Sequence, residues 1–122
     1  MSVPDFLLDE HITPVIQAQL AAREPGIRVL VIGQPGVPPK GTPDPELLRW
    51  IEQHGYLLVT ANRASMPVHL SAHLAAGHHV PGILILPRQW DLGRVLDELH
   101  LIWAASLPDE FRDRIVYLAV RR

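Results

Sequence analysis

The chain has 122 residues, 48% of them hydrophobic, which suits one modest folded core. A formal net charge of -2 argues against broad nonspecific binding of nucleic acid but does not exclude a local basic site. The absence of cysteine excludes disulfides, thiol catalysis and thiolate metal sites, and fits a reducing cytoplasm. No apolar run approaches the roughly 20 residues of a membrane span, and no signal peptide is recognisable, so we expect no membrane association.

The first third of the chain predicts two strands, one helix and a loop. The apolar run at 6–8 is typical of a short strand. Thr13 and Pro14 are expected to be the N-cap and first residue of a helix that ends near Arg23. The β-branched run at 27–32 predicts a strand buried on both faces, whereas glycine and proline make 33–43 a loop.

The same alternation continues to the end of the chain. Asp44 is expected to cap a helix with Pro45 at its first position, and Gly55 is expected to end it. A further helix is expected at 65–76, and Asp91 is expected to cap the last and longest one. The remaining predicted strands lie at 56–60, 82–86 and 114–120.

This order of elements predicts an α/β fold. Strands that alternate with helices form a mostly parallel sheet, here of about five strands, with helices on both faces in a three-layer α/β/α sandwich. Because no internal repeat and no linker interrupt the pattern, we expect residues 1–122 to form a single domain.

Polar residues gather where the predicted strands end. Asp9 and Glu10 follow the first strand, Thr60 and Asn62 follow the third, and Asp44 opens the helix after the second. Ligands of open α/β sheets bind beyond the carboxyl ends of the strands. Carboxylates gathered there are typical ligands of Mg²⁺ or Mn²⁺, which can polarise a phosphodiester. The alternative is structural, with Asp44 acting only as a helix cap and Glu10 facing solvent.

Four segments carry a resemblance to a known superfamily. They are "FLLDEH" (6–11), "GTPDPELL" (41–48), "LLVTANRASMPVH" (57–69) and "AAGHHVPGILIL" (75–86). In order and spacing they resemble the PIN-like nuclease superfamily, and within it a compact bacterial family of PIN-like proteins. The resemblance implies a Mg²⁺- or Mn²⁺-dependent ribonuclease site and an RNA substrate. Many relatives are toxins of toxin–antitoxin pairs and dimers are common, so it also implies an antitoxin partner and a homodimer.

The resemblance assigns roles to individual residues. Asp9 and Glu10 match the family's first acids, and Asp44 matches its middle acid, with Glu46 as a second contributor. Asp9 and Asp44 would hold the metal ion. Thr60-Ala61-Asn62 matches a Thr-x-Asp segment, so Asn62 stands where a third carboxylate is usual. Because asparagine carries no charge, we expect weaker metal affinity.

Three cationic or titratable side chains are candidates for substrate binding. Arg63 adjoins Asn62 and could meet a phosphate, although a solvated loop residue is the alternative. Lys40 lies in a loop that lacks the Gly-Lys-Ser/Thr order of a phosphate-binding loop. Its side chain could still reach the polar residues at the carboxyl ends of the strands. His69 and His73 are four residues apart, a spacing compatible with a metal, but Leu70 occupies the glutamate position of a zinc motif. We therefore interpret the two histidines as surface residues, with His69 as the better candidate for a substrate contact.

Two functions remain open from the sequence. The first is a metal-dependent endoribonuclease with an atypical site, in which Asp9, Glu10, Asp44, Thr60 and Asn62 act together. The second is a PIN-like domain that has lost catalysis and binds RNA or a protein partner, as Asn62 and Ala64 suggest.

Overall fold

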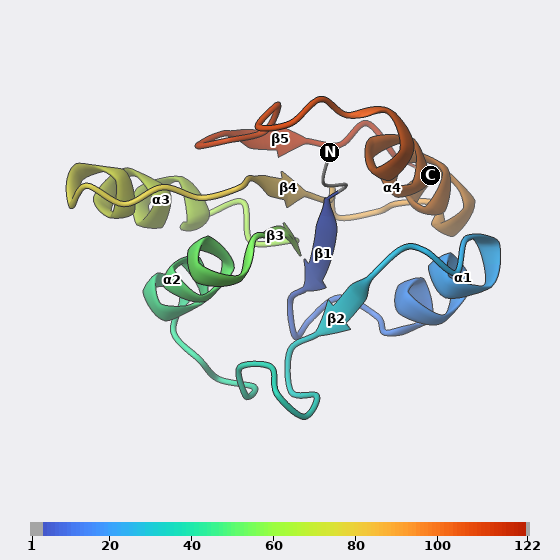
Figure 1. Cartoon of the computed structure of the whole chain (residues 1–122), viewed down its shortest axis with the longest axis horizontal. Coiled ribbons are helices and arrows are strands. Elements are labelled where there is room, and N and C mark those ends of the chain that lie inside the picture. Colours follow the sequence, from blue (N-terminus) through green and yellow to red (C-terminus); the bar gives the residue numbers. More distant parts are fainter. Residues whose placement is uncertain (1–3, 122) are drawn as a thin grey trace.

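The computed structural model describes residues 4–121, which contain a five-stranded sheet in the order β2-β1-β3-β4-β5 (Figure 1). Every neighbouring pair of strands is parallel. The α/β fold predicted from the sequence is thereby confirmed. The strands are β1 (Asp5–Leu8), β2 (Val29–Val31), β3 (Tyr56–Thr60), β4 (Ile83–Ile85) and β5 (Ile115–Tyr117). The helices are α1 (Val15–Arg23), α2 (Asp44–His54), α3 (Met66–Ala75) and α4 (Leu92–Ala105).

Helices cover both faces of the sheet, α1 and α4 on one side and α2 and α3 on the other (Figure 1). Successive residues of a strand point to opposite faces. Phe6 and Leu8 therefore pack in the core beneath α1 and α4, whereas Leu7 packs in the core beneath α2 and α3. Since both faces are covered, the interiors of the central strands are apolar, as in Phe6–Leu8 of β1 and Leu57–Val59 of β3, as expected for a parallel sheet.

The direction in which strands are added reverses at β1. From β1 the chain crosses to β2 at one edge, and then returns to β3 on the other side of β1 before adding β4 and β5. This reversal is the topological switch point at which open α/β sheets bind ligands. Asp9 follows β1 directly and Thr60 ends β3, so both lie at the carboxyl edge of the sheet at this point.

Several predicted boundaries are wrong by a few residues. The second strand is 29–31 rather than 27–32, because within the described residues it pairs only with Phe6–Leu8 of the short strand β1. The last strand is 115–117 rather than 114–120, since it pairs only with the three residues of β4. Helix α1 begins after Pro14, one residue later than expected. The cap at Asp91 is confirmed, as its side chain accepts the N–H of Arg94 at 3.0 Å.

None of the helices in the described residues is long and apolar enough to cross a bilayer.

A candidate metal site at the carboxyl edge of the sheet

Asp9 is buried at the end of β1 and is held by two hydrogen bonds. Its Oδ2 accepts the hydroxyl of Thr60 at 2.7 Å, and its Oδ1 accepts the backbone N–H of Glu10 at 2.8 Å. Asp9 also extends the ladder, because its own N–H donates to the carbonyl of Val59 at 2.9 Å. A buried carboxylate is costly unless it is hydrogen-bonded, and these bonds satisfy it in a fixed orientation.

Asp44 is joined to the same edge through Asn62. The Asn62 side-chain amide donates from Nδ2 to Oδ2 of Asp44 at 2.9 Å, and the backbone N–H of Asn62 donates to the Thr60 hydroxyl oxygen at 3.1 Å. A chain of hydrogen bonds therefore runs from Asp9 through Thr60 and Asn62 to Asp44. His69 lies beside this chain without a hydrogen bond to it, with Nε2 at 3.6 Å from Oδ2 of Asp44.

The predicted cap role of Asp44 is wrong. Helix α2 starts at Asp44 itself, with Pro43 as its N-cap, and no side chain of residues 4–121 caps it. As the first helical residue, Asp44 contributes its charge to the positive end of the helix, which is favourable. Its carboxylate makes its hydrogen bond with Asn62.

Asn62 is held so that its oxygen faces away from Asp44. The Asn62 oxygen accepts from the backbone N–H of Ser65 at 3.2 Å and from its hydroxyl at 3.1 Å, while Nδ2 also donates to Ser65 Oγ at 2.8 Å. A carboxylate can only accept, so the amide nitrogen must face Asp44. Asn62 thus connects Asp44 to the start of α3. Ser65, which the sequence predicts only as the start of a helix, is therefore a neighbour of the site. The Asn-x-x-Ser spacing just before that helix was the available signal.

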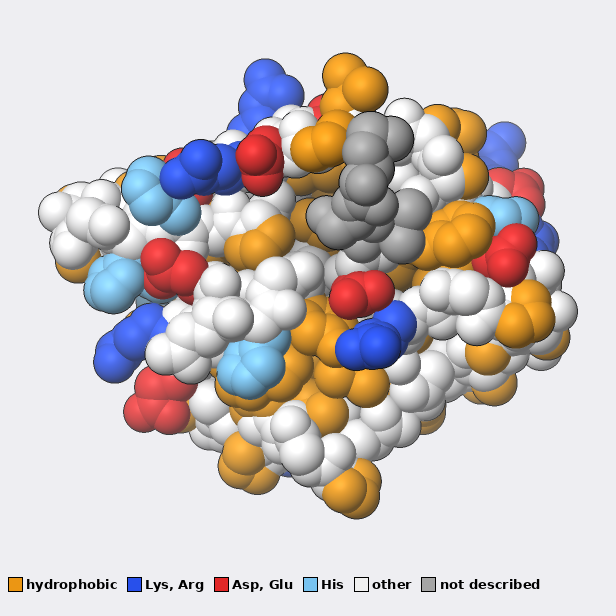
Figure 2. All heavy atoms as spheres, in the orientation of Figure 1, with side chains coloured by type: hydrophobic (Ala, Val, Ile, Leu, Met, Phe, Trp, Pro, Cys, Tyr) orange, Lys and Arg blue, Asp and Glu red, His pale blue; other side chains and the backbone are white. Residues whose placement is uncertain are grey.

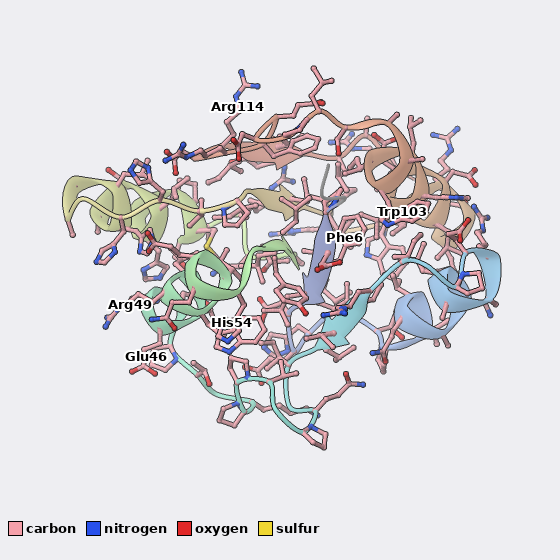
Figure 3. The ribbon with its side chains drawn as sticks, in the orientation of Figure 1. Phe6, Glu46, Arg49, His54, Trp103 and Arg114 are labelled. Atoms are coloured by element: carbon pink, nitrogen blue, oxygen red, sulfur yellow. The ribbon has the colours of Figure 1, made fainter. Side chains whose placement is uncertain are left out.

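Glu10 fixes the loop that precedes α2. Its Oε1 accepts the backbone N–H of Gly41 at 3.0 Å, which ties the end of β1 to the loop between β2 and α2. Lys40 is exposed, and its aliphatic stem lies against Gly33, where a Cβ would come within 3.2 Å of Lys40 Cγ. Glu46 is exposed and points outward from α2 in Figure 3, so it does not join Asp9 and Asp44 at the carboxyl edge of the sheet.

Arg63 lies at the same edge, above the last strand. Its guanidinium carbon is 5.5 Å from the centre of the Tyr117 ring, a cation–π arrangement. Tyr117 is 51% exposed and is in register with Ile85, which in turn is in register with Thr60. With strands about 4.8 Å apart, the Tyr117 backbone lies roughly 10 Å from that of Thr60 along the edge. Tyr117 is not predictable as a site residue, because nothing in "RIVYLAV" distinguishes an exposed aromatic residue from a core residue.

The acids at this edge do not form a compact three-ligand cluster. Among residues 4–121, the one group of three histidine or acid side chains whose ligand atoms lie within 4.8 Å of one another is Glu52, His73 and His78. That group lies near the other end of α2. A metal ion at the carboxyl edge would therefore depend on Asp9 and Asp44 and complete its coordination with water.

The interpretation of His73 as a surface residue is wrong. Its side chain is 4% exposed, and its Nε2 lies 3.2 Å from Oε1 of Glu52 and 3.1 Å from the carbonyl of His79. The backbone N–H of His79 donates to Oε2 of Glu52 at 3.0 Å, and this bond is the main cause that holds the pKa of Glu52 below its usual range. Nearby His78 and His73 lower that pKa further, against the effect of burial.

A cavity of about 330 Å³ is lined by neither Asp9 nor Asp44, the two acids of the carboxyl edge. It is lined in part by Pro4, Gly55 and Phe111, near the amino ends of the strands. No candidate residue from the sequence lines it. Its lining includes the acids Glu52, Asp109 and Glu110, but among residues 4–121 these three do not form a group whose ligand atoms lie within 4.8 Å of one another. Chemistry, rather than size, therefore identifies the carboxyl edge as the candidate site.

We find no match to this chain among protein-family models, curated proteins or solved structures. The class that the fold and site define is an α/β protein with two tethered carboxylates at the switch point of its sheet. The resemblance to PIN-like nucleases remains a prediction from the sequence.

Proposed function

We propose that this protein is a metal-dependent ribonuclease that hydrolyses phosphodiester bonds of single-stranded RNA. The observation that carries the proposal is the hydrogen-bonded chain from Asp9 through Thr60 and Asn62 to Asp44. It fixes two carboxylates from different elements at the point of the sheet where ligands bind. The toxin role, the antitoxin partner and the homodimer belong to the same proposal, since they rest on the same resemblance.

The donor set at this edge fits a hard cation. A carboxylate has about four lone-pair sites, and the hydrogen bonds described above use two at Asp9 and one at Asp44. Free lone pairs on oxygen suit Mg²⁺ or Mn²⁺, which also keep several waters for a substrate. Asn62 would not be a ligand in this orientation, because its oxygen is bonded to Ser65.

The residues of the site would have two kinds of role, either binding the metal ion or keeping its carboxylate ligands in position. A bound Mg²⁺ or Mn²⁺ would offset charge on the phosphate and make a water more acidic. Asp9 and Asp44 would hold that ion, while Thr60 and Asn62 keep the two carboxylates in place. Arg63 would attract the RNA phosphate, and the exposed Tyr117 ring beside it would stack on a base.

A second candidate function is favoured by one specific observation. The Asn62 amide occupies an oxygen of Asp44 where the resemblance expects another acid. A domain with this substitution would bind RNA through Arg63 and Tyr117 without cleaving it. Both proposed functions use the same edge of the sheet to bind RNA. They differ in whether the bound RNA is cleaved.

Cleavage of a varied panel of single-stranded RNAs in Mn²⁺, with and without a chelator, separates the two functions. The nuclease predicts metal-dependent cleavage. Saturable RNA binding by folded protein that cleaves none of the panel would favour the binding module instead.

A further inference from the structure

Three metal-ligating side chains meet at the far end of α2 and α3. Glu52 comes from the last turns of α2, His73 from the last turn of α3 and His78 from the turn that follows. Oε1 of Glu52 lies 3.2 Å from Nε2 of His73 and 3.1 Å from Nδ1 of His78. In the view of Figure 2, histidine and acidic side chains lie beside one another on the α3 side of the molecule.

The local fold explains why the two histidines converge. Helix α3 ends in a turn in which the N–H of His78 donates to the carbonyl of His73 at 3.1 Å and that of Gly77 to Leu74 at 3.0 Å. Gly77 has φ of +85°, which a side chain would resist. This turn folds His78 back, so that the two imidazole rings stack with centres 4.8 Å apart.

Glu52 is fixed independently of any ligand. Its second oxygen, Oε2, accepts the backbone N–H of His79 at 3.0 Å, which leaves Oε1 directed at the two histidines. The His79 ring is engaged elsewhere, with Nδ1 at 2.7 Å from Oδ2 of Asp113. The cluster therefore consists of one carboxylate oxygen and two imidazole nitrogens.

We propose that Glu52, His73 and His78 bind one divalent first-row transition metal ion of the Zn²⁺ class, with water as the fourth ligand. Zn²⁺ binds imidazole nitrogen and carboxylate oxygen at about 2.0–2.2 Å, which for a tetrahedron places neighbouring ligand atoms roughly 3.3 Å apart. The two distances from Glu52 already match that spacing. Two histidines and one glutamate plus water are a known zinc ligand set, and imidazole disfavours Mg²⁺.

The site is accessible and separate from the carboxyl edge. A groove of about 220 Å³ between α2 and α3 is lined by His73 and His78, and also by Arg49, which points outward in Figure 3. His69, the neighbour of Asp44, lines the same groove, whereas Glu52 does not. Glu52 lies eight residues after Asp44 on the same helix, about 12 Å along its axis. Metal at one site therefore leaves the other free.

Metal binding replaces the present contacts of the two histidine nitrogens and links three segments. His73 now donates from Nε2 to the carbonyl of His79, so metal binding requires the tautomer with the proton on Nδ1. In exchange, the ion would join α2, α3 and the turn before β4. Because the unfolded chain lacks this arrangement, the ion should stabilise the folded state.

The test uses tag-free protein, stripped of metal, and Zn²⁺ alone as the probe. Calorimetry should detect one saturable site, and Co²⁺ should give the visible absorption of a tetrahedral complex. At free zinc about 100 times the dissociation constant, the melting temperature should rise by roughly 10 °C. Glu52→Gln keeps an oxygen for the His79 N–H, and His78→Asn changes a half-exposed side chain, so both should fold. Each should weaken zinc binding by roughly 100-fold or more, which exceeds the usual loss of an outer partner.

His100→Asn on α4 is the control, since it removes a histidine outside the cluster and should bind zinc like the wild type. The proposal is overturned if folded wild-type protein shows no saturable site at micromolar zinc. It is equally overturned if Glu52→Gln and His78→Asn bind as the control does, in which case the cluster is only a hydrogen-bond network at a helix end. RNA cleavage is not measured, so the proposed nuclease function stands or fails separately.

Discussion

The Thr60 hydroxyl donates to Oδ2 of Asp9 at 2.7 Å, and its oxygen accepts the backbone N–H of Asn62 at 3.1 Å. Thr60 is fully buried, so neither bond can be replaced by water. One threonine therefore connects the acid after β1 with the segment that reaches Asp44.

Thr60→Val should destabilise the protein and impair the site. Valine keeps the shape but leaves an oxygen of Asp9 and the Asn62 N–H without this partner, at a cost of about 1–3 kcal/mol of unfolding free energy. Urea denaturation measures that loss. Thr60→Ser should retain most of the stability, and Thr42→Val should cost little, because the Thr42 hydroxyl bonds an exposed carbonyl. Equal stability of Thr60→Val and the wild type would contradict the importance of the bond.

Asn62→Asp should make stability depend on metal. It replaces the amide donor 2.9 Å from Asp44 by a second carboxylate, so without metal the two acids repel each other. In chelator the variant should lose about 1–3 kcal/mol of unfolding free energy. Mn²⁺ should raise its melting temperature more than that of the wild type. Asn62→Ala is the control without the added charge, and an equal response to Mn²⁺ in the two variants would rule out a shared cation site.

Arg63 and Tyr117 should contribute to RNA affinity. Arg63→Gln removes one phosphate contact, and the slope of log affinity against log salt should become shallower by about 0.7 for a single strand. Tyr117→Leu removes a stacking face worth about 1–3 kcal/mol, a loss of roughly 5- to 150-fold in affinity. Arg112→Gln, outside the carboxyl edge, is the charge control. Fluorescence anisotropy at several salt concentrations measures the RNA affinity of each variant. If Arg63→Gln and Tyr117→Leu bind RNA as the control Arg112→Gln does, RNA does not bind along the carboxyl edge.

The sequence predicted the α/β architecture because apolar runs and helical patterns report local periodicity. It predicted that Asp9, Thr60 and Asn62 would meet, since parallel strands end at one edge. It could not predict that Asn62 would turn its oxygen to Ser65, because side-chain orientation depends on the packed loop. The Glu52–His73–His78 cluster was missed for a similar reason. Its members come from two helices and a turn, and no linear spacing includes Glu52.

Asp5 should give a pH dependence of stability. Burial raises the pKa of Asp5 above its usual 3.8, while the charge of Arg28 lowers it. Because the folded pKa exceeds the unfolded one, the stability that Asp5 contributes is fully present below about pH 3.8 and is lost as pH rises through the folded pKa.

Asp5→Asn cannot titrate, so it should gain stability relative to the wild type as pH rises across that window. Urea denaturation at several pH values measures the gain, and carbon NMR of the Asp5 carboxyl gives its midpoint directly. Arg28 and Tyr56 are the neighbouring titratable groups and remain in both proteins. A midpoint at or below 3.8 would show that burial does not dominate.

The central claim is tested most directly by RNA cleavage with wild type and Asp9→Asn in Mn²⁺, each repeated with chelator. Asparagine keeps the size of the side chain and an oxygen for Thr60, but loses the charge that would hold the ion. Asp97→Asn is the matched control, because Asp97 is an exposed acid on α4. We expect cleavage by the wild type and by Asp97→Asn that chelator abolishes, and a loss of at least about 100-fold in Asp9→Asn. Equal cleavage by Asp9→Asn, or none by a folded wild type, would contradict the account.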